Sequence, residues 1–110
     1  MEQYTSKITV TKHYIGELVH HKLFNYRGVI IDIDANFQLT DDWYETVAKS
    51  RPPKNEPWYH VLVDGVINST YVAEQNLEAD LTGKKIDHPM THKFFSHFQD
   101  GKYINDKMVN

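Results

Sequence analysis

The chain contains no cysteine among its 110 residues. This excludes disulfide bonds, thiolate metal ligands and a cysteine nucleophile. Long apolar runs are also missing: no stretch approaches the ~20 apolar residues of a membrane-spanning helix, and residues 1–12 lack the apolar core of a secretory signal. We therefore expect a soluble, cytoplasmic protein that has no membrane partner and forms one domain over residues 1–110.

A surplus of positive charge is absent as well. The formal net charge is −3, and residues 32–80 carry ten acidic and three basic side chains, whereas residues 1–31 and 81–110 each carry two more basic than acidic ones. Proteins that bind duplex DNA obtain much of their affinity from basic side chains on phosphates. The composition predicts weak duplex binding unless folding gathers the basic ends on one face.

What the chain does contain is two segments with the pattern of a β-hairpin, at residues 16–34 and 58–77. Each has two apolar strands around a short turn rich in Asn, Asp or Gly, such as Asp64-Gly65. Val29, Ile31 and Ile33 alternate with other residues at the period of two that is typical of a strand with one buried face. The fold class is therefore mainly β, a small twisted sheet built from hairpins that spans residues 14–80.

Two further segments have helical patterns. In the insertion at residues 36–56, Thr40 or Asp42 can cap a short helix over residues 41–49, which Pro52 and Pro53 stop. In the C-terminal extension, residues 81–110, three large apolar side chains recur at helical spacing, with a terminator at Gly101: Met90, Phe94 and Phe98. Residues 102–110 are expected to fray.

The second hairpin predicts an unusual surface. Tyr59, Val61 and Val63 are expected to point inward, which leaves Trp58 and Leu62 on the outer face. Such a face needs a cover from the insertion, from the C-terminal segment or from another subunit. We therefore expect a homo-oligomer, with partner contacts at three residues: Trp43, Trp58 and Leu62.

Histidines and carboxylates raise the question of a metal. His88, His92 and His97 lie four and five residues apart, but no Glu accompanies them as in a metalloprotease motif. Asp32 and Asp34 are spaced so that both carboxylates project to one side of a strand. Because no nucleophile motif and no Gly-rich phosphate loop is present, we expect no enzyme, no metal and no cofactor, and a metal-dependent hydrolase is the remote alternative.

The aromatic residues favour binding over catalysis. Small barrels use exposed rings as stacking platforms for single strands or peptides, whereas rings in a core only fill space. Both roles are open for seven residues: Phe24, Tyr26, Trp43, Tyr44, Trp58, Tyr59 and Tyr71.

Several blocks of the chain resemble the YccV-like family, also called HspQ or hemimethylated DNA-binding proteins. These blocks are Ile15-Gly16, Val19-x-His21-x-x-Phe24-x-Tyr26-x-Gly28-Val29-Ile30-x-Asp32-x-Asp34, Arg51-Pro52-x-Lys54, Pro57-Trp58-Tyr59-His60-Val61-Leu62-Val63-Asp64-Gly65 and Tyr71-Val72-Ala73-Glu74-x-Asn76-Leu77. The resemblance covers about residues 14 to 80, and residues 88 to 103 look like the tail of the longer members. It implies a small SH3-like β-barrel without catalysis, which binds hemimethylated DNA and is linked to heat-shock regulation of protein turnover by the Lon protease.

The resemblance assigns no DNA-contact residue, so the contact surface is chosen from the residues. Basic and aromatic side chains gather around the first hairpin, at His20, His21, Lys22, Tyr26 and Arg27. We therefore predict a non-enzymatic regulator whose partners are duplex DNA and Lon or its substrates. An adaptor that binds proteins without significant DNA binding is the alternative.

Overall fold

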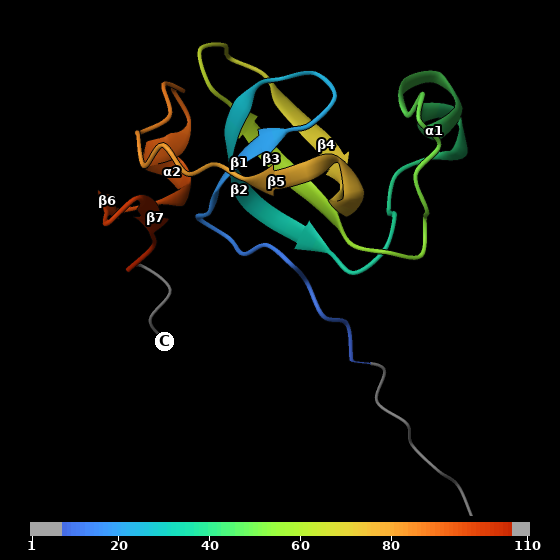
Figure 1. The fold of residues 1–110 in the computed structure, drawn as a ribbon, viewed down its shortest axis with the longest axis horizontal. Helices are drawn as coiled ribbons and strands as arrows, with labels where there is room; N and C mark the ends of the chain where they lie inside the picture. Colours follow the sequence, from blue (N-terminus) through green and yellow to red (C-terminus); the bar gives the residue numbers. More distant parts are fainter. Residues whose placement is uncertain (1–7, 107–110) are drawn as a thin grey trace, which may run out of the picture.

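The computed structural model describes residues 8–106, and a five-stranded antiparallel sheet is its largest element (Figure 1). The strands are β1 (Leu18–His21), β2 (Arg27–Asp34), β3 (Trp58–Val63), β4 (Ser69–Ala73) and β5 (Leu77–Ala79), in the order β4-β3-β2-β1-β5. A short 3-10 turn, η1 (Glu74–Asn76), connects the edge strands β4 and β5. The expected small, mainly β fold with its two hairpins is confirmed, although within residues 8–106 no ladder between β4 and β5 closes the barrel.

The inner face of this sheet holds an apolar core. Six buried side chains from all five strands form it: Val19, Ile30, Tyr59, Val61, Val72 and Leu77. The predicted alternation in β2 is interrupted by a β-bulge between Ile30 and Asp32, opposite Val61 and His60 of β3. Because a bulge adds one residue, Ile30 and Ile33 pack against the same core although they are three residues apart.

The insertion contains the predicted helix, α1 (Asp41–Val47). Thr40 is its N-cap and accepts a hydrogen bond of 3.1 Å from the backbone N–H of Trp43, as the sequence indicates. The helix ends two residues earlier than expected, and Arg51 in the loop behind it has a positive φ of 52°. Tyr44 of this helix packs with Trp58 and Ala73, so the insertion covers one end of the outer face of the sheet.

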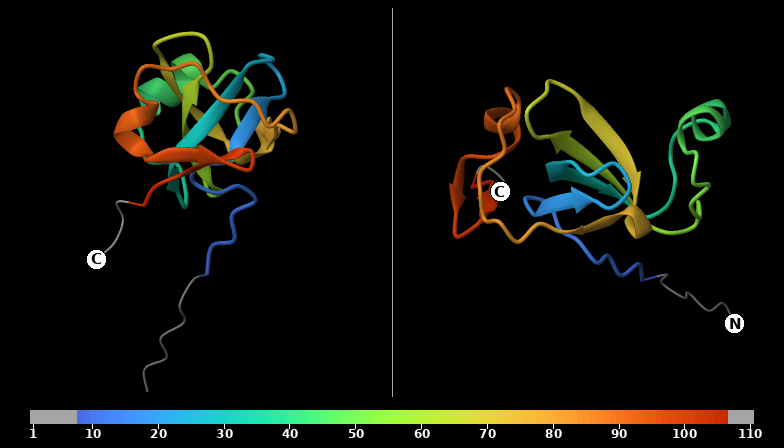
Figure 2. Two further views of the ribbon diagram at one scale, coloured as in Figure 1. Left: turned by 90° about the vertical axis from the view of Figure 1, so that its left-hand side faces the viewer. Right: turned by 45° about the horizontal axis from the view of Figure 1, so that its top comes forward.

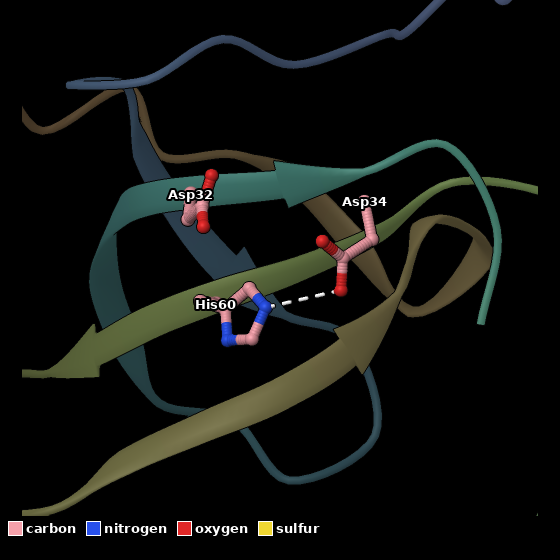
Figure 3. Close-up of side chains that lie close together, drawn as sticks. All are labelled: Asp32, Asp34 and His60. Atoms are coloured by element: carbon pink, nitrogen blue, oxygen red, sulfur yellow. Dashed lines mark hydrogen bonds and ion pairs between the residues drawn. The ribbon is translucent and has the colours of Figure 1, made fainter. Parts of the chain in front are cut away.

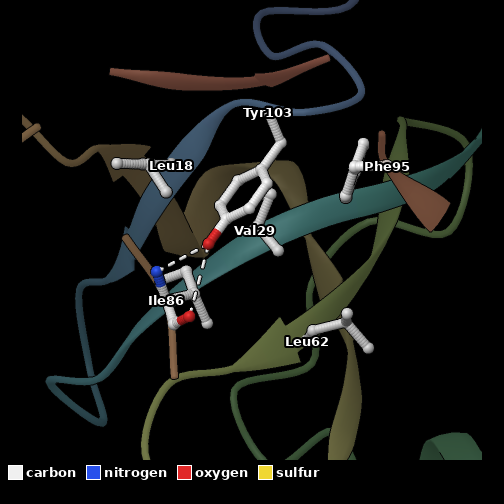
Figure 4. Close-up of a cluster of buried hydrophobic side chains, with 6 residues drawn as sticks. All are labelled: Leu18, Val29, Leu62, Ile86, Phe95 and Tyr103. Carbon is white, nitrogen blue, oxygen red and sulfur yellow. Dashed lines mark hydrogen bonds between the residues drawn. The ribbon is translucent and has the colours of Figure 1, made fainter. Parts of the chain in front are cut away.

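The C-terminal extension covers the other end of the outer face. Figure 4 shows Tyr103 and Phe95 over Leu18, Val29 and Leu62 of three neighbouring strands. The Tyr103 hydroxyl accepts a hydrogen bond of 2.9 Å from the N–H of Ile86 and also lies 3.3 Å from the Ile86 carbonyl oxygen. The C-terminal segment is thereby fastened to the sheet.

The predicted C-terminal helix is wrong in length. Helix α2 (Thr91–Phe94) has a single turn, and a hairpin of β6 (His97–Gln99) and β7 (Lys102–Ile104) follows it. Asp100 and Gly101 at its turn both have positive φ, 53° and 79°, which a two-residue hairpin loop requires. Residues 102–104 therefore form a strand instead of fraying, and Tyr103 is buried.

These two covers lie at opposite ends of the sheet (Figure 2). Trp58 is 1% exposed and Leu62 is 2% exposed, so both side chains of the outer face are covered, as expected, and the covers come from the same chain. Of the three possible covers, the insertion takes Trp58 and the C-terminal segment takes Leu62. The outer face therefore does not need a second subunit to cover it, and the homo-oligomer stays a prediction.

The described helices are all short. Within residues 8–106, none is long and apolar enough to cross a membrane.

Candidate binding groove

The five predicted DNA-contact residues all lie on the β1–β2 hairpin, but few of them are available. His20 and His21 end β1, Lys22 begins the loop, Tyr26 ends it and Arg27 begins β2. The Tyr26 hydroxyl lies 2.8 Å from Thr70 Oγ1, and burial raises the pKa of this phenol despite that bond. Lys22 is exposed, and its ammonium has no ion pair within residues 8–106.

Arg27 is neutralised inside the protein. Its Nε donates a hydrogen bond of 2.8 Å to Asp80 Oδ2, and one terminal nitrogen lies 3.2 Å from Asp64 Oδ2. The other terminal nitrogen donates to the carbonyl oxygen of Lys84. Burial raises the pKa of Asp80, but hydrogen bonds from Thr82 and Arg27 outweigh it and keep that pKa below its ordinary value. Arg27 therefore fixes the start of β2 and the loop at Lys84.

The two neighbouring histidines have opposite environments. His20 lies 2.6 Å from Asn25 Oδ1 and 2.7 Å from Glu78 Oε2, and these hydrogen bonds raise its pKa. His21 is buried, and the loss of solvent lowers its pKa. The Nδ1 of His21 accepts hydrogen bonds from the backbone N–H groups of Leu23 and Phe24, which requires the neutral ring. His21 thus shapes the loop, whereas both ring nitrogens of His20 face oxygen atoms, which favours its charged form.

A groove of about 720 Å³ lies between β4, the β1–β2 loop and the α1 insertion. The loop contributes Leu23 and Phe24, and the insertion contributes Leu39, Trp43 and Val47. Among the described residues that line the groove, no Asp or Glu occurs, and Lys49 is the only side chain with a full charge. The groove is therefore apolar with one cationic point.

The floor of the groove is strand β4, all five of whose residues line it. Backbone hydrogen bonds join Glu74 to Pro57 and Val63 to Asn68 on either side of the β3–β4 ladder. Hydrogen-bonded and non-hydrogen-bonded pairs alternate in an antiparallel ladder. By this alternation, Thr70 and Val72 are the β4 residues that bond to β3. The N–H and C=O groups of Ser69, Tyr71 and Ala73 therefore point away from β3, toward the free edge of the sheet.

The predicted partner-binding residues separate into two places. Trp43 and Trp58 both line the groove, where Trp58 stacks on Tyr71 with a ring distance of 5.2 Å and Trp43 meets Tyr71 edge-on at 5.7 Å. Leu62 lies in the cluster under the C-terminal segment and does not line the groove.

Asp32, Asp34 and His60 form the one group of potential metal ligands among the described residues (Figure 3). Their ligand atoms lie within 4.8 Å of one another. Asp34 Oδ2 already accepts a hydrogen bond of 2.7 Å from the Tyr71 hydroxyl and lies 3.1 Å from His60 Nε2. Burial, followed by the bond to Asp34, raises the pKa of Tyr71, so the hydroxyl stays a donor. The cluster thus orients Tyr71 and His60 in the groove without needing an ion.

The histidines of the C-terminal extension do not share one helix face. His88 is buried, accepts from the N–H of Met90 and lies 3.0 Å from the carbonyl oxygen of Asn68. His92 lies on α2, and His97 lies on β6, 3.5 Å from Asp106. The spacing considered for a metal therefore does not bring the three rings together.

Sequence reasoning found part of the groove. Phe24, Tyr26, Trp43, Trp58 and Tyr71 belong to the aromatic set proposed as a platform. Other lining residues were missed because their single apolar or polar side chains carry no motif, among them Leu23, Leu39, Val47, Lys49 and Ser69. What these residues share is their position on or beside the edge strand β4, and no sequence pattern reveals that position.

The family comparison agrees with the resemblance. The family model described as hemimethylated DNA-binding protein, YccV-like, matches residues 11–102. The match includes all five strands of the sheet, the insertion and most of the C-terminal cover.

Proposed function

The chain belongs to the YccV-like family of hemimethylated DNA-binding proteins, and from this membership we propose that it binds hemimethylated duplex DNA as a non-enzymatic regulator. The match over residues 11–102 carries the proposal, because it spans the sheet and both covers. The family is a DNA-binding family and not an enzyme family.

The proposed DNA surface is the end of the sheet around Arg27. Arg27 binds the carbonyl oxygen of Lys84, which places the exposed side chains of Lys84 and Lys85 at this end of the sheet. His20 lies there too, because it pairs with Arg27 in the β1–β2 ladder. Lys22 extends this surface along the loop. Arg27 itself positions the lysine loop and does not contact phosphate, which revises the role predicted for it.

Few phosphates can be neutralised by this surface. Glu78, Asp64 and Asp80 lie within it and pair with His20 and Arg27. Only the three lysines are then left for phosphates, and each contact contributes a slope of about 0.9 to the fall of log affinity with log salt. We expect weak binding at physiological salt with a shallow slope.

Titration of three duplexes that differ only in methylation, unmethylated, hemimethylated and fully methylated, tests the proposal. We expect the hemimethylated duplex to bind best and the Lys84→Ala/Lys85→Ala variant to bind all three more weakly. Leu81→Ser, an exposed residue beside the same loop, is the control and should bind like the wild type. Equal affinity for the three duplexes would contradict the methylation preference, and no binding to any would contradict the DNA role.

A second candidate function is an adaptor in protein turnover, through Lon or its substrates. The groove favours it, because an apolar groove with a free strand edge is the kind of surface that binds polypeptide. Degradation of a Lon substrate in the presence and absence of the protein tests this candidate. A change in the rate that Val47→Ser abolishes supports it, and an unchanged rate contradicts it.

A further inference from the structure

We propose that the groove between β4 and α1 binds an extended, apolar protein segment that carries an acidic residue, and that this segment adds to β4 as a sixth strand. The proposal goes beyond DNA binding and gives the adaptor role a binding site. It rests on the backbone of β4, the apolar walls of the groove and the charge of its lining.

The backbone of β4 provides the directional contacts. Ser69, Tyr71 and Ala73 point their N–H groups away from β3 and toward the groove, and Ser69 and Tyr71 point their C=O groups the same way. The C=O of Ala73 is used inside the chain, because Ala73 is the N-cap of η1 and its carbonyl accepts the first bond of that turn. An open strand edge is a template for another strand, because its donors and acceptors repeat at the spacing of an extended chain. The five residues of β4 offer about 17 Å of edge at 3.4 Å per residue.

The walls of the groove provide the apolar contacts. Four large apolar side chains that line it are exposed to solvent, by the following fractions: Leu23 57%, Phe24 68%, Leu39 41% and Val47 50%. They stand on opposite sides, two on the β1–β2 loop and two on the α1 insertion. A strand lying between them would cover both walls with its alternate side chains.

The charge of the lining decides between polypeptide and nucleic acid. A single strand of nucleic acid brings one phosphate per nucleotide, and grooves that bind it follow the backbone with several cations. Among the described lining residues, Lys49 is alone in carrying a full positive charge, and no carboxylate faces it from the groove. One cation on an apolar wall matches one acidic side chain on an otherwise apolar segment.

The first experiment uses a short fluorescein-labelled peptide in which valine and threonine alternate and one aspartate stands near the end. Two control peptides have the same composition except for one change each. The first carries lysine in place of aspartate, and the second carries N-methyl groups at alternate residues, which removes the donors on one edge. We expect the parent peptide to bind the full-length protein and both controls to bind at least about tenfold more weakly, as expected when charge-assisted or several backbone hydrogen bonds are lost.

Variants of the protein test the same contacts from the other side. Ser69→Pro removes an outward N–H of β4 without touching the bonds to β3, since proline is tolerated where an edge N–H faces solvent. Val47→Ser and Lys49→Glu change the wall and its charge. Leu81→Ser, at an apolar residue that is 92% exposed outside the groove, is the matched control. We expect the three groove variants to lose peptide binding and the control to retain it, with all four melting cooperatively.

Hydrogen exchange of the backbone amides identifies the occupant. Bound peptide should protect Ser69, Tyr71 and Ala73, whereas the already bonded Thr70 and Val72 should change little. Peptide binding without this alternation would overturn the strand addition. Protection of the same amides by a single-stranded oligonucleotide, or by a second copy in a dimer that Ser69→Pro dissociates, would assign the groove to that occupant and overturn the proposal. Loss of DNA binding in the lysine variants with peptide binding intact would separate the two functions.

Discussion

The Tyr71 hydroxyl donates a hydrogen bond of 2.7 Å to Asp34, which ties the edge strand β4 to the end of β2 across the intervening strand β3. The same hydroxyl oxygen accepts a bond of 3.1 Å from the backbone N–H of Gln38, where the insertion begins. The Tyr71 hydroxyl therefore links β4, the floor of the groove, to the start of the insertion. The stacking of Tyr71 on Trp58 continues this link into the core under α1.

Tyr71→Phe is expected to lower the free energy of unfolding by about 1 kcal/mol, because both hydrogen bonds of the hydroxyl are lost while the ring stays. Urea denaturation measures the change. Tyr14→Phe is the matched control, since Tyr14 is half exposed and no hydrogen bond of its hydroxyl is found within residues 8–106. Equal stability of the two variants would show that the Asp34 bond contributes nothing.

Removal of metal ions should leave the protein unchanged. Asp34 is occupied by Tyr71 and His60, so the Asp32, Asp34 and His60 group does not need an ion to be satisfied. We expect the same melting temperature before and after treatment with a chelator, and no stoichiometric metal in the purified protein. A drop in melting temperature that added metal restores would revive the metal-dependent hydrolase.

His20 and His21 should titrate on opposite sides of the ordinary value of 6.5. The raised pKa of His20 gives stability that is full below pH 6.5 and is lost as pH rises through its folded pKa. The lowered pKa of His21 acts in reverse, because protonation of the unfolded chain removes stability as pH falls below 6.5. NMR titration of the ring C–H signals measures both, and Glu78→Gln should lower the pKa of His20 alone. Two rings that titrate on the same side would contradict this description.

Gly28→Val should destabilise the protein by about 1 to 3 kcal/mol through overpacking. A Cβ at Gly28 would lie 2.6 Å from the carbonyl oxygen of Leu62 and closer still to the Val61 side chain. Gly28 does not have a positive φ, so close backbone approach is what requires a glycine at this position. Ala79→Val introduces the same residue at an exposed strand position and serves as control. Equal melting temperatures of the two variants would contradict the close packing.

Local patterns predicted the elements that local contacts determine. The cap at Thr40 and the turn at Asp64-Gly65 lie within a few residues of what they control, and both are found. At the C-terminus two local patterns competed: Met90, Phe94 and Phe98 have helical spacing, but the positive φ of Asp100 and Gly101 produces a hairpin. The Asp-Gly pair was the available signal.

The site could be predicted only in part, because its properties depend on distant residues. Arg27 was predicted to contact DNA, but the sequence could not show that it pairs with Asp80, which lies 53 residues away. The free edge of β4 exists because the sheet order puts β5 beside β1, and the apolar walls come from two loops that approach only in the fold. Such pairings are not written in any short stretch of sequence.

Amide shift mapping with the hemimethylated duplex tests the central claim most directly, namely that this protein binds DNA at a surface separate from the groove. The account predicts shifts at Lys22, Lys84 and Lys85 that diminish with added salt, while Ser69 and Tyr71 remain unchanged and still respond to the peptide. Shifts confined to the groove residues, or none at saturating duplex, would contradict it.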